Sequence, residues 1–167
     1  MNREYYIYWY RFNAKDSYLI WFSTDDNDGF VVDEKGYIPS FESIEDVLAF
    51  AQKHQINVNV DTPKIFDLGF IETWLNTNSD TIEDYNPFLN AWNLFDDVSI
   101  STEGNFDKNR TYTNDIYERI FWGCNIPAIT PEGESFSPTW TKTELKIIRR
   151  TLKFGFQMFR EKVKSTK

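Results

Sequence analysis

The sequence predicts an α+β fold, in which an N-terminal antiparallel β-meander packs against several α-helices and a long basic amphipathic helix comes last. Two observations predict this class. The first third of the chain alternates aromatic and β-branched segments with short polar turns, which is the pattern of a meander. The remainder carries apolar residues at helical spacing behind recognisable helix-start signals. A chain of 167 residues suits one core, so we expect residues 1–167 to form a single domain.

The meander is expected from three segments, EYYIYWYRF (4–12), SYLIWFS (17–23) and GFVVD (29–33). The short turns NAKD and TDDND separate them. All three segments place large residues on both faces, so we expect the sheet to be covered on at least part of each side. The next segment, YIPSF, contains Pro39, which suits an edge strand or a strand end.

A helix is expected over 43–54, where Ser43 and Asp46 resemble a capping box. The alternating segment INVNV (56–60) can return to the sheet as a strand. The segment IFDLGFIETWLN (65–76) then shows a helical pattern in which Gly69 is the weak point. Its apolar face consists of Phe70, Ile71, Trp74 and Leu75.

The following helix is expected to begin with Asn86 as its N-cap and Pro87 in its first turn. Its apolar stripe is Phe88, Ala91, Trp92, Phe95 and Val98, and its other side carries Asn90, Asn93, Asp96 and Asp97. A short helix is expected over 115–123, ending at Gly123. Residues 125–140 are rich in Pro, Gly and Ser, which predicts an ordered loop.

The last helix has the clearest signals in the chain. Thr141 and Glu144 form a capping box at its start. Its apolar stripe follows the 3.6-residue period through Leu145, Ile148, Leu152, Phe156, Phe159 and Val163. Lys and Arg fill the rest, and their surplus near the C-terminal end complements the helix dipole.

Cysteine usage and hydropathy predict a cytoplasmic protein. One cysteine, Cys124, cannot form an intramolecular disulfide, which fits a reducing compartment. The segment MNREYYIYWYRF lacks the basic, apolar and small-residue regions of a signal peptide. No stretch approaches the roughly 18 apolar residues of a membrane span, so we expect no membrane partner.

The net charge of −8 conceals an uneven distribution. Residues 142–167 carry nine Lys or Arg and two Glu, a net of +7, whereas residues 1–141 carry nine basic and 24 acidic residues, a net of −15. An acidic body of this kind repels nucleic acid and attracts basic proteins. Solubility alone is the alternative explanation for such a surface.

The segment STDDNDGFVVDEKG (23–36) raises the question of a calcium loop. With Gly29 at the sixth position of such a loop, Thr24, Asp26 and Asp28 fall at ligand positions, but Lys35 takes the place of the final bidentate Glu. The flanking segments are strands rather than helices. With one His and one Cys in the chain, a zinc site would need mostly carboxylates, which is atypical. We therefore expect a hairpin connection here, with no metal and no cofactor.

Catalytic residue types are scarce. His54 lies near the end of a predicted helix, where the dipole favours an exposed His, and Cys124 lies in an apolar neighbourhood that favours an inert thiol. No nucleophile elbow, phosphate-binding loop or dinucleotide fingerprint occurs. A Cys–His pair and a carboxylate-based hydrolase, with a carbohydrate site lined by Trp and Asp, remain as enzyme alternatives. We expect a protein that is not an enzyme.

The basic C-terminal helix offers phosphate contacts at Lys146, Arg149, Arg150 and Lys153. The acidic body would oppose the approach of a polyanion, so we expect no nucleic-acid partner. We expect instead that part of this helix packs over the acidic body and neutralises it.

The chain resembles the small acidic immunity proteins of bacterial contact-dependent growth inhibition and related polymorphic toxin systems. The resemblance rests on YYIYWYRF, DDNDGFVVDEKGYIPSFESIEDVLAFA, NPFLNAWNLFDD and the C-terminal RIFWGCNIPAITPEGESFSPTWTKTELKIIRRTLKFGFQMF. It implies a cytoplasmic protein that binds and neutralises one cognate toxin, commonly a nuclease. These families have no universal catalytic residues to transfer. A general regulatory or adaptor protein with another cellular partner is the alternative.

An inhibitor of a nuclease can place carboxylates where the phosphates of the substrate would lie. Acidic side chains are dense and little diluted by lysines in one loop and in the 80–97 region, and Tyr85 beside them suits an aromatic anchor. The expected toxin-binding residues are therefore Asp25, Asp26, Asp28, Asp80, Glu83, Asp84, Tyr85, Asp96 and Asp97.

Overall fold

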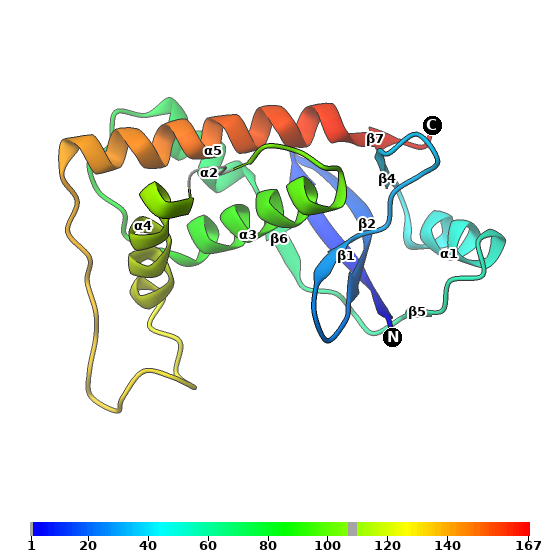
Figure 1. Ribbon diagram of the computed structural model, residues 1–167, viewed down its shortest axis with the longest axis horizontal. Helices are drawn as coiled ribbons and strands as arrows, with labels where there is room; N and C mark the ends of the chain where they lie inside the picture. Colours follow the sequence, from blue (N-terminus) through cyan, green and yellow to red (C-terminus); the bar gives the residue numbers. More distant parts are fainter. Residues whose placement is uncertain (1, 107–109) are drawn as a thin grey trace.

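The computed structural model describes residues 2–106 and 110–167 and has the predicted α+β architecture (Figure 1). In chain order the elements are β1 (Glu4–Phe12), β2 (Lys15–Ser23), β3 (Asp28–Phe30), β4 (Ile38–Ser40), α1 (Ile44–Lys53), β5 (Val58–Asn59), β6 (Ile65–Asp67), α2 (Gly69–Asn76), α3 (Asn86–Ser101), α4 (Arg110–Gly123), α5 (Lys142–Lys162) and β7 (Val163–Ser165). Within the described residues, no helix is both long and apolar enough to cross a membrane.

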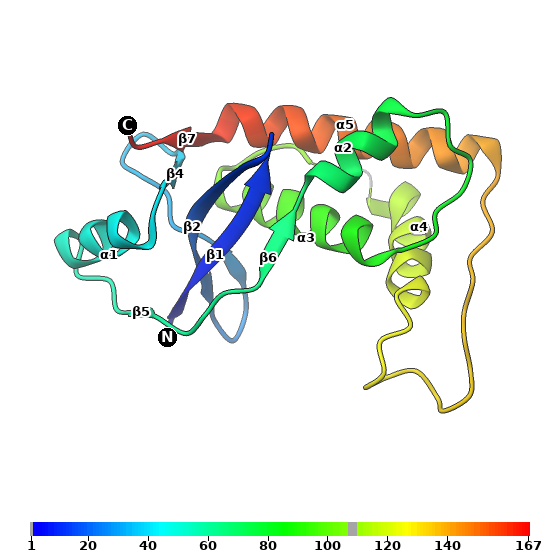
Figure 2. The ribbon, with the colours of Figure 1, turned by 180° about the vertical axis from the view of Figure 1, so that it is seen from behind.

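The predicted meander is present. β1 pairs with β2 in antiparallel register from Glu4 opposite Ser23 to Phe12 opposite Lys15, and β3 continues the series with Phe30 opposite Trp21. The turn between β1 and β2 has two residues with positive φ, which matches the twist of a tight hairpin. β5 and β6 add to β1 in parallel, and Figure 2 shows β6 beside β1.

The sheet is covered on both faces, as predicted. Because side chains alternate along a strand, Tyr8 and Tyr10 of β1 point to the side of α3 and α5, whereas Ile7 points to the other side. The first set belongs to the main core, in which Tyr10 lies 5.3 Å from Phe159 of α5 between ring centroids. Ile7 belongs to a smaller core that includes Val47 of α1.

Helices α3 and α5 form the centre of the main core. The predicted stripe of α3 is buried along its whole length, and so is the stripe of α5 from Leu145 to Phe159. The two helices come close at Gly155, where an added Cβ would overlap the ring of Phe95. A glycine in the middle of a helix costs about 1 kcal/mol relative to Ala, and here it permits the close contact.

Two of the three helix starts predicted from capping signals are confirmed. Thr141 accepts a hydrogen bond from the backbone of Glu144, whose side chain accepts one from the backbone of Thr141. Ser43 accepts one from the backbone of Asp46. The prediction for Asn86 is wrong, because Asn86 is already the first residue of α3, and the side chain of Asp84 accepts its backbone N–H at 3.0 Å.

Other boundaries also differ from the prediction, and the third strand of the meander, β3, ends at Phe30 rather than at residue 33. Residues 65–67 form strand β6 rather than helix, because they pair with Trp9–Arg11 of β1, and α2 begins at Gly69. α4 begins at Arg110 rather than at 115. Val163 packs against the main core as the stripe predicts, but it starts β7 instead of continuing α5, and β7 pairs in parallel with β4, the strand that contains Pro39.

Candidate functional site

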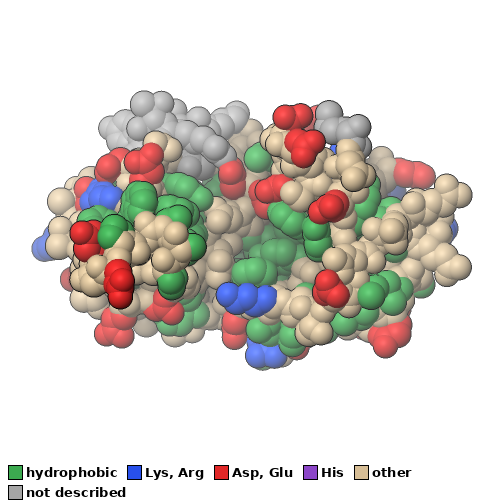
Figure 3. Space-filling view, turned by 90° about the horizontal axis from the view of Figure 1, so that it is seen from below, with side chains coloured by type: hydrophobic (Ala, Val, Ile, Leu, Met, Phe, Trp, Pro, Cys, Tyr) green, Lys and Arg blue, Asp and Glu red, His purple; other side chains and the backbone are tan. Residues whose placement is uncertain are grey.

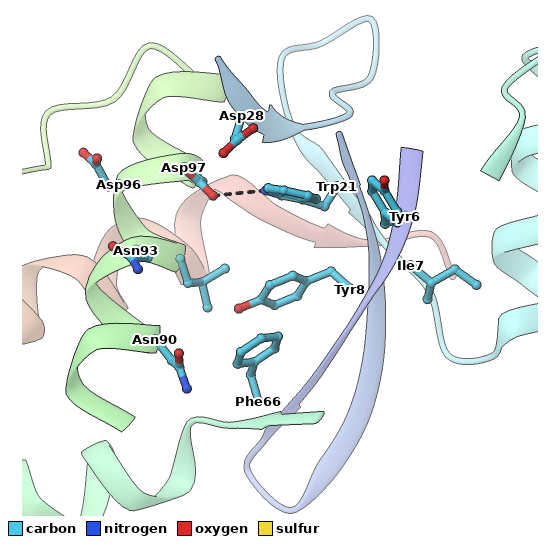
Figure 4. Close-up of a pocket in the computed structure, with 11 residues that line it drawn as sticks. Tyr6, Ile7, Tyr8, Trp21, Asp28, Phe66, Asn90, Asn93, Asp96 and Asp97 are labelled. Atoms are coloured by element: carbon cyan, nitrogen blue, oxygen red, sulfur yellow. Dashed lines mark hydrogen bonds between the residues drawn. The ribbon is translucent and has the colours of Figure 1, made fainter. Parts of the chain in front are cut away.

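A cavity of about 550 Å³ lies between the sheet and α3 (Figure 4). The side formed by the sheet is aromatic and the side formed by α3 is largely polar, with Asp28 of β3 at one end. Figure 3, which looks onto the molecule from below, shows a hollow with a hydrophobic floor and acidic side chains beside it. A concave apolar site with a few convergent polar groups is the usual form of a binding site.

The aromatic wall follows from strand alternation. Tyr6 and Tyr8 are two residues apart in β1 and therefore share a face. Trp21 of β2 is the cross-strand partner of Tyr6, with ring centroids 5.8 Å apart. Tyr8 stacks on Phe66 of β6 at 4.7 Å and meets Phe30 of β3 edge-on at 5.3 Å. The ring of Tyr8 is thus held between two other rings.

The polar wall follows from helical spacing. Asn90, Asn93 and Asp97 recur at intervals of three and four along α3, so they share one side of the helix. Ser101 fixes the end of α3 to the sheet, since its hydroxyl donates to the carbonyl of Asp97 at 2.6 Å and accepts from the backbone N–H of Phe30 at 2.8 Å. This link holds Asp97 opposite the aromatic wall.

Asp97 is a partly buried carboxylate. Its Oδ2 accepts a hydrogen bond from the indole Nε1 of Trp21 at 3.1 Å, and in the described part of the chain it makes no salt bridge. Burial raises its pKa to about 6, the charges of Asp28 and Asp96 add to this rise, and the hydrogen bond from Trp21 opposes it. Among the residues that the structure describes, no cation compensates the negative charge of Asp97.

The hydroxyl of Tyr8 points across the cavity toward α3 (Figure 4). Burial raises the pKa of this phenol well above its ordinary value, and the charge of Asp97 adds to the effect, so Tyr8 stays neutral. Among the described residues none hydrogen-bonds to this hydroxyl. The cavity thus offers a carboxylate and a free phenolic oxygen close to aromatic faces.

The structure brings together three of the residues expected from the sequence. Asp28, Asp96 and Asp97 come from β3 and from the last turns of α3, and all three line the cavity. Asp25 and Asp26 lie exposed in the turn between β2 and β3, which is built around the side chain of Thr24.

The other expected residues lie elsewhere. Asp80, Glu83 and Asp84 are exposed in the connection between α2 and α3, and none of them lines the cavity. Tyr85 is 7% exposed, and its hydroxyl accepts a hydrogen bond from the indole of Trp140 at 2.7 Å. Its ring is part of the core and is not available as the aromatic anchor that the sequence suggested.

The sequence did not single out the aromatic half of the site. Tyr6, Tyr8, Trp21 and Phe66 all look like core residues in a sequence, because each lies in a strand-like apolar pattern. The sequence predicts Asn90 and Asn93 on the polar side of α3. The apolar pattern of α3 does not specify which part of its polar side faces the sheet. No signal in the sequence therefore identifies Asn90 and Asn93 as part of the cavity wall.

The alternatives involving His54, Cys124 and metals gain no support. Cys124 donates a hydrogen bond to the carbonyl of Ile120 at 3.4 Å, and burial raises the pKa of its thiol. α1 and α4, which end beside His54 and Cys124, lie at opposite ends of the molecule (Figure 1), so no Cys–His pair forms. Across residues 2–106 and 110–167, no group of three or more His, Cys, Asp or Glu could hold a metal ion.

The basic helix α5 uses part of its charge internally. Arg149 donates to the backbone carbonyls of Trp74 and Ser79, at 3.2 and 2.6 Å, and its guanidinium lies over the ring of Trp74. Arg160 pairs with Glu72 at 3.2 Å. Lys146, Arg150 and Lys153 are exposed, so α5 neutralises the acidic body only in part.

Comparisons with known proteins give the fold alone. No protein-family model matches the sequence, and no curated protein matches it. Among solved structures, the chain is similar to the SatS C-terminal domain, determined in complex with bromine. The two share 13% identity with a TM-score of 0.59, over 98% of this chain and 93% of that chain. This likeness supports the α+β architecture and leaves the function to be inferred from the site.

Proposed function

We propose that this protein binds a basic protein partner stoichiometrically on the face around the cavity, and that it acts as a cytoplasmic immunity protein against a toxin. The proposal rests chiefly on one observation: Asp28, Asp96 and Asp97 converge on a cavity with an aromatic wall. Carboxylates around an aromatic recess suit the Lys and Arg side chains of a protein that binds nucleic acid. The toxin is accordingly expected to be a nuclease.

The overall charge supports the same proposal. Residues 1–141 carry nine basic and 24 acidic residues, so their net charge of −15 steers a cationic partner toward this surface. Interfaces derive most of their affinity from a few side chains in well-packed recesses. The cavity supplies such a recess, and the exposed carboxylates of the β2–β3 turn supply a charged rim.

A carboxylate-based hydrolase is the second candidate, because the pKa of Asp97 is about 6. A raised pKa of this kind suits a general acid. The two candidates predict different behaviour. A hydrolase loses turnover when Asp97 is replaced by Asn, whereas a binding protein shows graded losses of affinity that depend on salt.

Co-expression with the product of the gene immediately upstream tests the proposal. We expect the wild-type protein to protect the cells and to co-purify with that product in a 1:1 complex. The Asp28→Asn/Asp97→Asn variant should bind at least about tenfold more weakly, as expected for two charged contacts. Continued cell death together with the absence of a complex would overturn the proposal.

A further inference from the structure

We infer that the cavity between β1, β6 and α3 is a receptor for one arginine side chain, with Asp97 and Tyr8 as acceptors and the aromatic wall as a stacking surface. This inference deepens the proposed function and rests on it for the source of the arginine, namely the basic partner. The volume of about 550 Å³ falls within the ordinary range for ligand pockets.

The first argument is charge. Asp97 is partly buried beside the carboxylates of Asp28 and Asp96, and among the described residues its side chain accepts a hydrogen bond only from the neutral indole of Trp21. An anion would be repelled by this group, and a neutral ligand would leave the buried charge uncompensated. A cation is attracted to the carboxylate of Asp97 and compensates its buried charge. Part of the cost of dehydrating this carboxylate is already met in the free protein, because the side chain is partly buried.

The second argument is the balance of donors and acceptors. A guanidinium has five N–H donors and no acceptor, so its site must provide acceptors. The cavity provides the carboxylate of Asp97 and the hydroxyl of Tyr8. None of the described residues hydrogen-bonds to the hydroxyl of Tyr8. Asn90 adds a side-chain carbonyl oxygen on the same side of α3 as Asp97.

The third argument is the shape of the cation. A guanidinium is planar and weakly hydrated, so it stacks on aromatic rings more readily than an ammonium does. This protein already uses that contact repeatedly. Arg149 lies 4.1 Å from the ring centroid of Trp74, and Arg119 lies 4.5 Å from that of Trp140. The ring of Trp21 offers a face of the same kind, with no described cation over it.

The indole N–H of Trp21 is a direct reporter, because it donates to the carboxylate that would take the guanidinium. We would titrate ¹⁵N-labelled protein at pH 7 with N-acetyl-L-arginine amide and follow this resonance, assigned with a Trp21→Phe variant. N-acetyl-L-citrulline amide, a neutral isostere, and N-acetyl-L-lysine amide serve as matched probes. We expect a saturable shift with arginine, at least threefold weaker binding of lysine, and no binding of citrulline.

Two variants separate the cavity from bulk charge. Asp97→Asn retains an acceptor for Trp21 but removes the charge, and should weaken arginine binding at least about tenfold. Asp80→Asn also removes one negative charge, but at an exposed position outside the cavity, and should change the affinity for arginine less than twofold. Equal binding of citrulline and arginine, equal binding of lysine, equal losses in the two variants, or no shift of Trp21 with any probe would each overturn the inference.

The arginine site and the proposed function can fail separately. If a complex forms with the upstream-encoded protein and Asp97→Asn leaves its affinity unchanged, the arginine site is wrong and the proposed function stands. If arginine shifts Trp21 as expected and no basic protein partner binds, the site stands and the proposed function fails.

Discussion

The indole Nε1 of Trp21 donates a hydrogen bond to Oδ2 of Asp97 at 3.1 Å, joining β2 to α3 across 76 positions of the chain. This contact fixes the carboxylate of Asp97 at the wall of a cavity, but the neutral indole does not compensate its negative charge. In the free protein the arrangement costs stability, because a partly buried anion has lost hydration that a single neutral donor does not replace. The same arrangement favours a cationic ligand.

Replacing Asp97 with Asn is expected to stabilise the free protein at neutral pH. The pKa of Asp97 is raised from 3.8 to about 6, so the folded state holds its proton more tightly than the unfolded state. Stability then falls as the pH rises from about 4 to about 6 and levels off above that, by at most about 3 kcal/mol. Asn has no proton to lose and avoids this cost.

Urea unfolding at pH 4 and pH 7.5 measures the effect. The Asp97→Asn variant should be more stable than the wild type by about 1–3 kcal/mol at pH 7.5, with a much smaller difference at pH 4. The exposed control Asp80→Asn should stay within about 0.5 kcal/mol of the wild type at both values. A wild type that is as stable as Asp97→Asn at pH 7.5 would show that Asp97 carries no such cost.

Gly155→Ala is expected to destabilise the protein even though Ala is the better helix former. The added Cβ would overlap the ring of Phe95, so the α3–α5 contact must open. Overpacking of this kind costs about 1–3 kcal/mol. Denaturant unfolding should show this loss, whereas the exposed neighbour Gln157→Ala should show almost none. A gain in stability for Gly155→Ala would contradict the close contact between α3 and α5 at Phe95.

Arg149→Lys is expected to cost about 1–3 kcal/mol, because an ammonium cannot reproduce the fork that reaches the carbonyls of Trp74 and Ser79. Arg150→Lys, one residue on and exposed, provides the matched control and should lie within about 0.5 kcal/mol of the wild type. Thermal unfolding of the two variants side by side makes the comparison. Equal melting temperatures would refute the role of Arg149 as a clamp between α5 and the α2–α3 connection.

Thr141→Ala is expected to cost about 1 kcal/mol, because it removes the acceptor for the backbone N–H of Glu144. Thr143→Ala, inside the first turn of α5 and exposed, should be neutral or slightly stabilising because Ala is the better helix former. Unfolding by urea distinguishes the two. If both substitutions have the same effect, the capping box does not contribute to stability.

The predictable parts of the fold were those with local causes. The start of α5 follows from Thr141 and Glu144, which lie three residues apart and bond to each other's backbone. The N-cap predicted for α3 was wrong, because the side chain of Asp84 accepts the first backbone N–H of the helix, which belongs to Asn86. Strand β6 was missed because three residues gain their strand structure only from β1, more than 50 positions earlier.

Part of the site was predictable because the density of acidic residues is a local property of the sequence. Acidic density pointed to Asp28 and Asp97, but their convergence depends on the docking of α3 against β3 through Ser101. Tyr85 was misjudged because acidic neighbours suggest exposure, whereas Trp140, 55 positions later, covers its hydroxyl. Aromatic residues of strands have two possible roles, core and binding wall, and only the tertiary structure separates them.

The central claim is that the Asp97 cavity, rather than acidic charge in general, receives the basic partner. Isothermal titration calorimetry with the upstream-encoded protein tests it most directly, using two double variants that each remove two negative charges. We expect Asp28→Asn/Asp97→Asn to weaken binding at least about tenfold and Asp80→Asn/Glu83→Gln to weaken it less than threefold. Equal losses for the two double variants would contradict the claim.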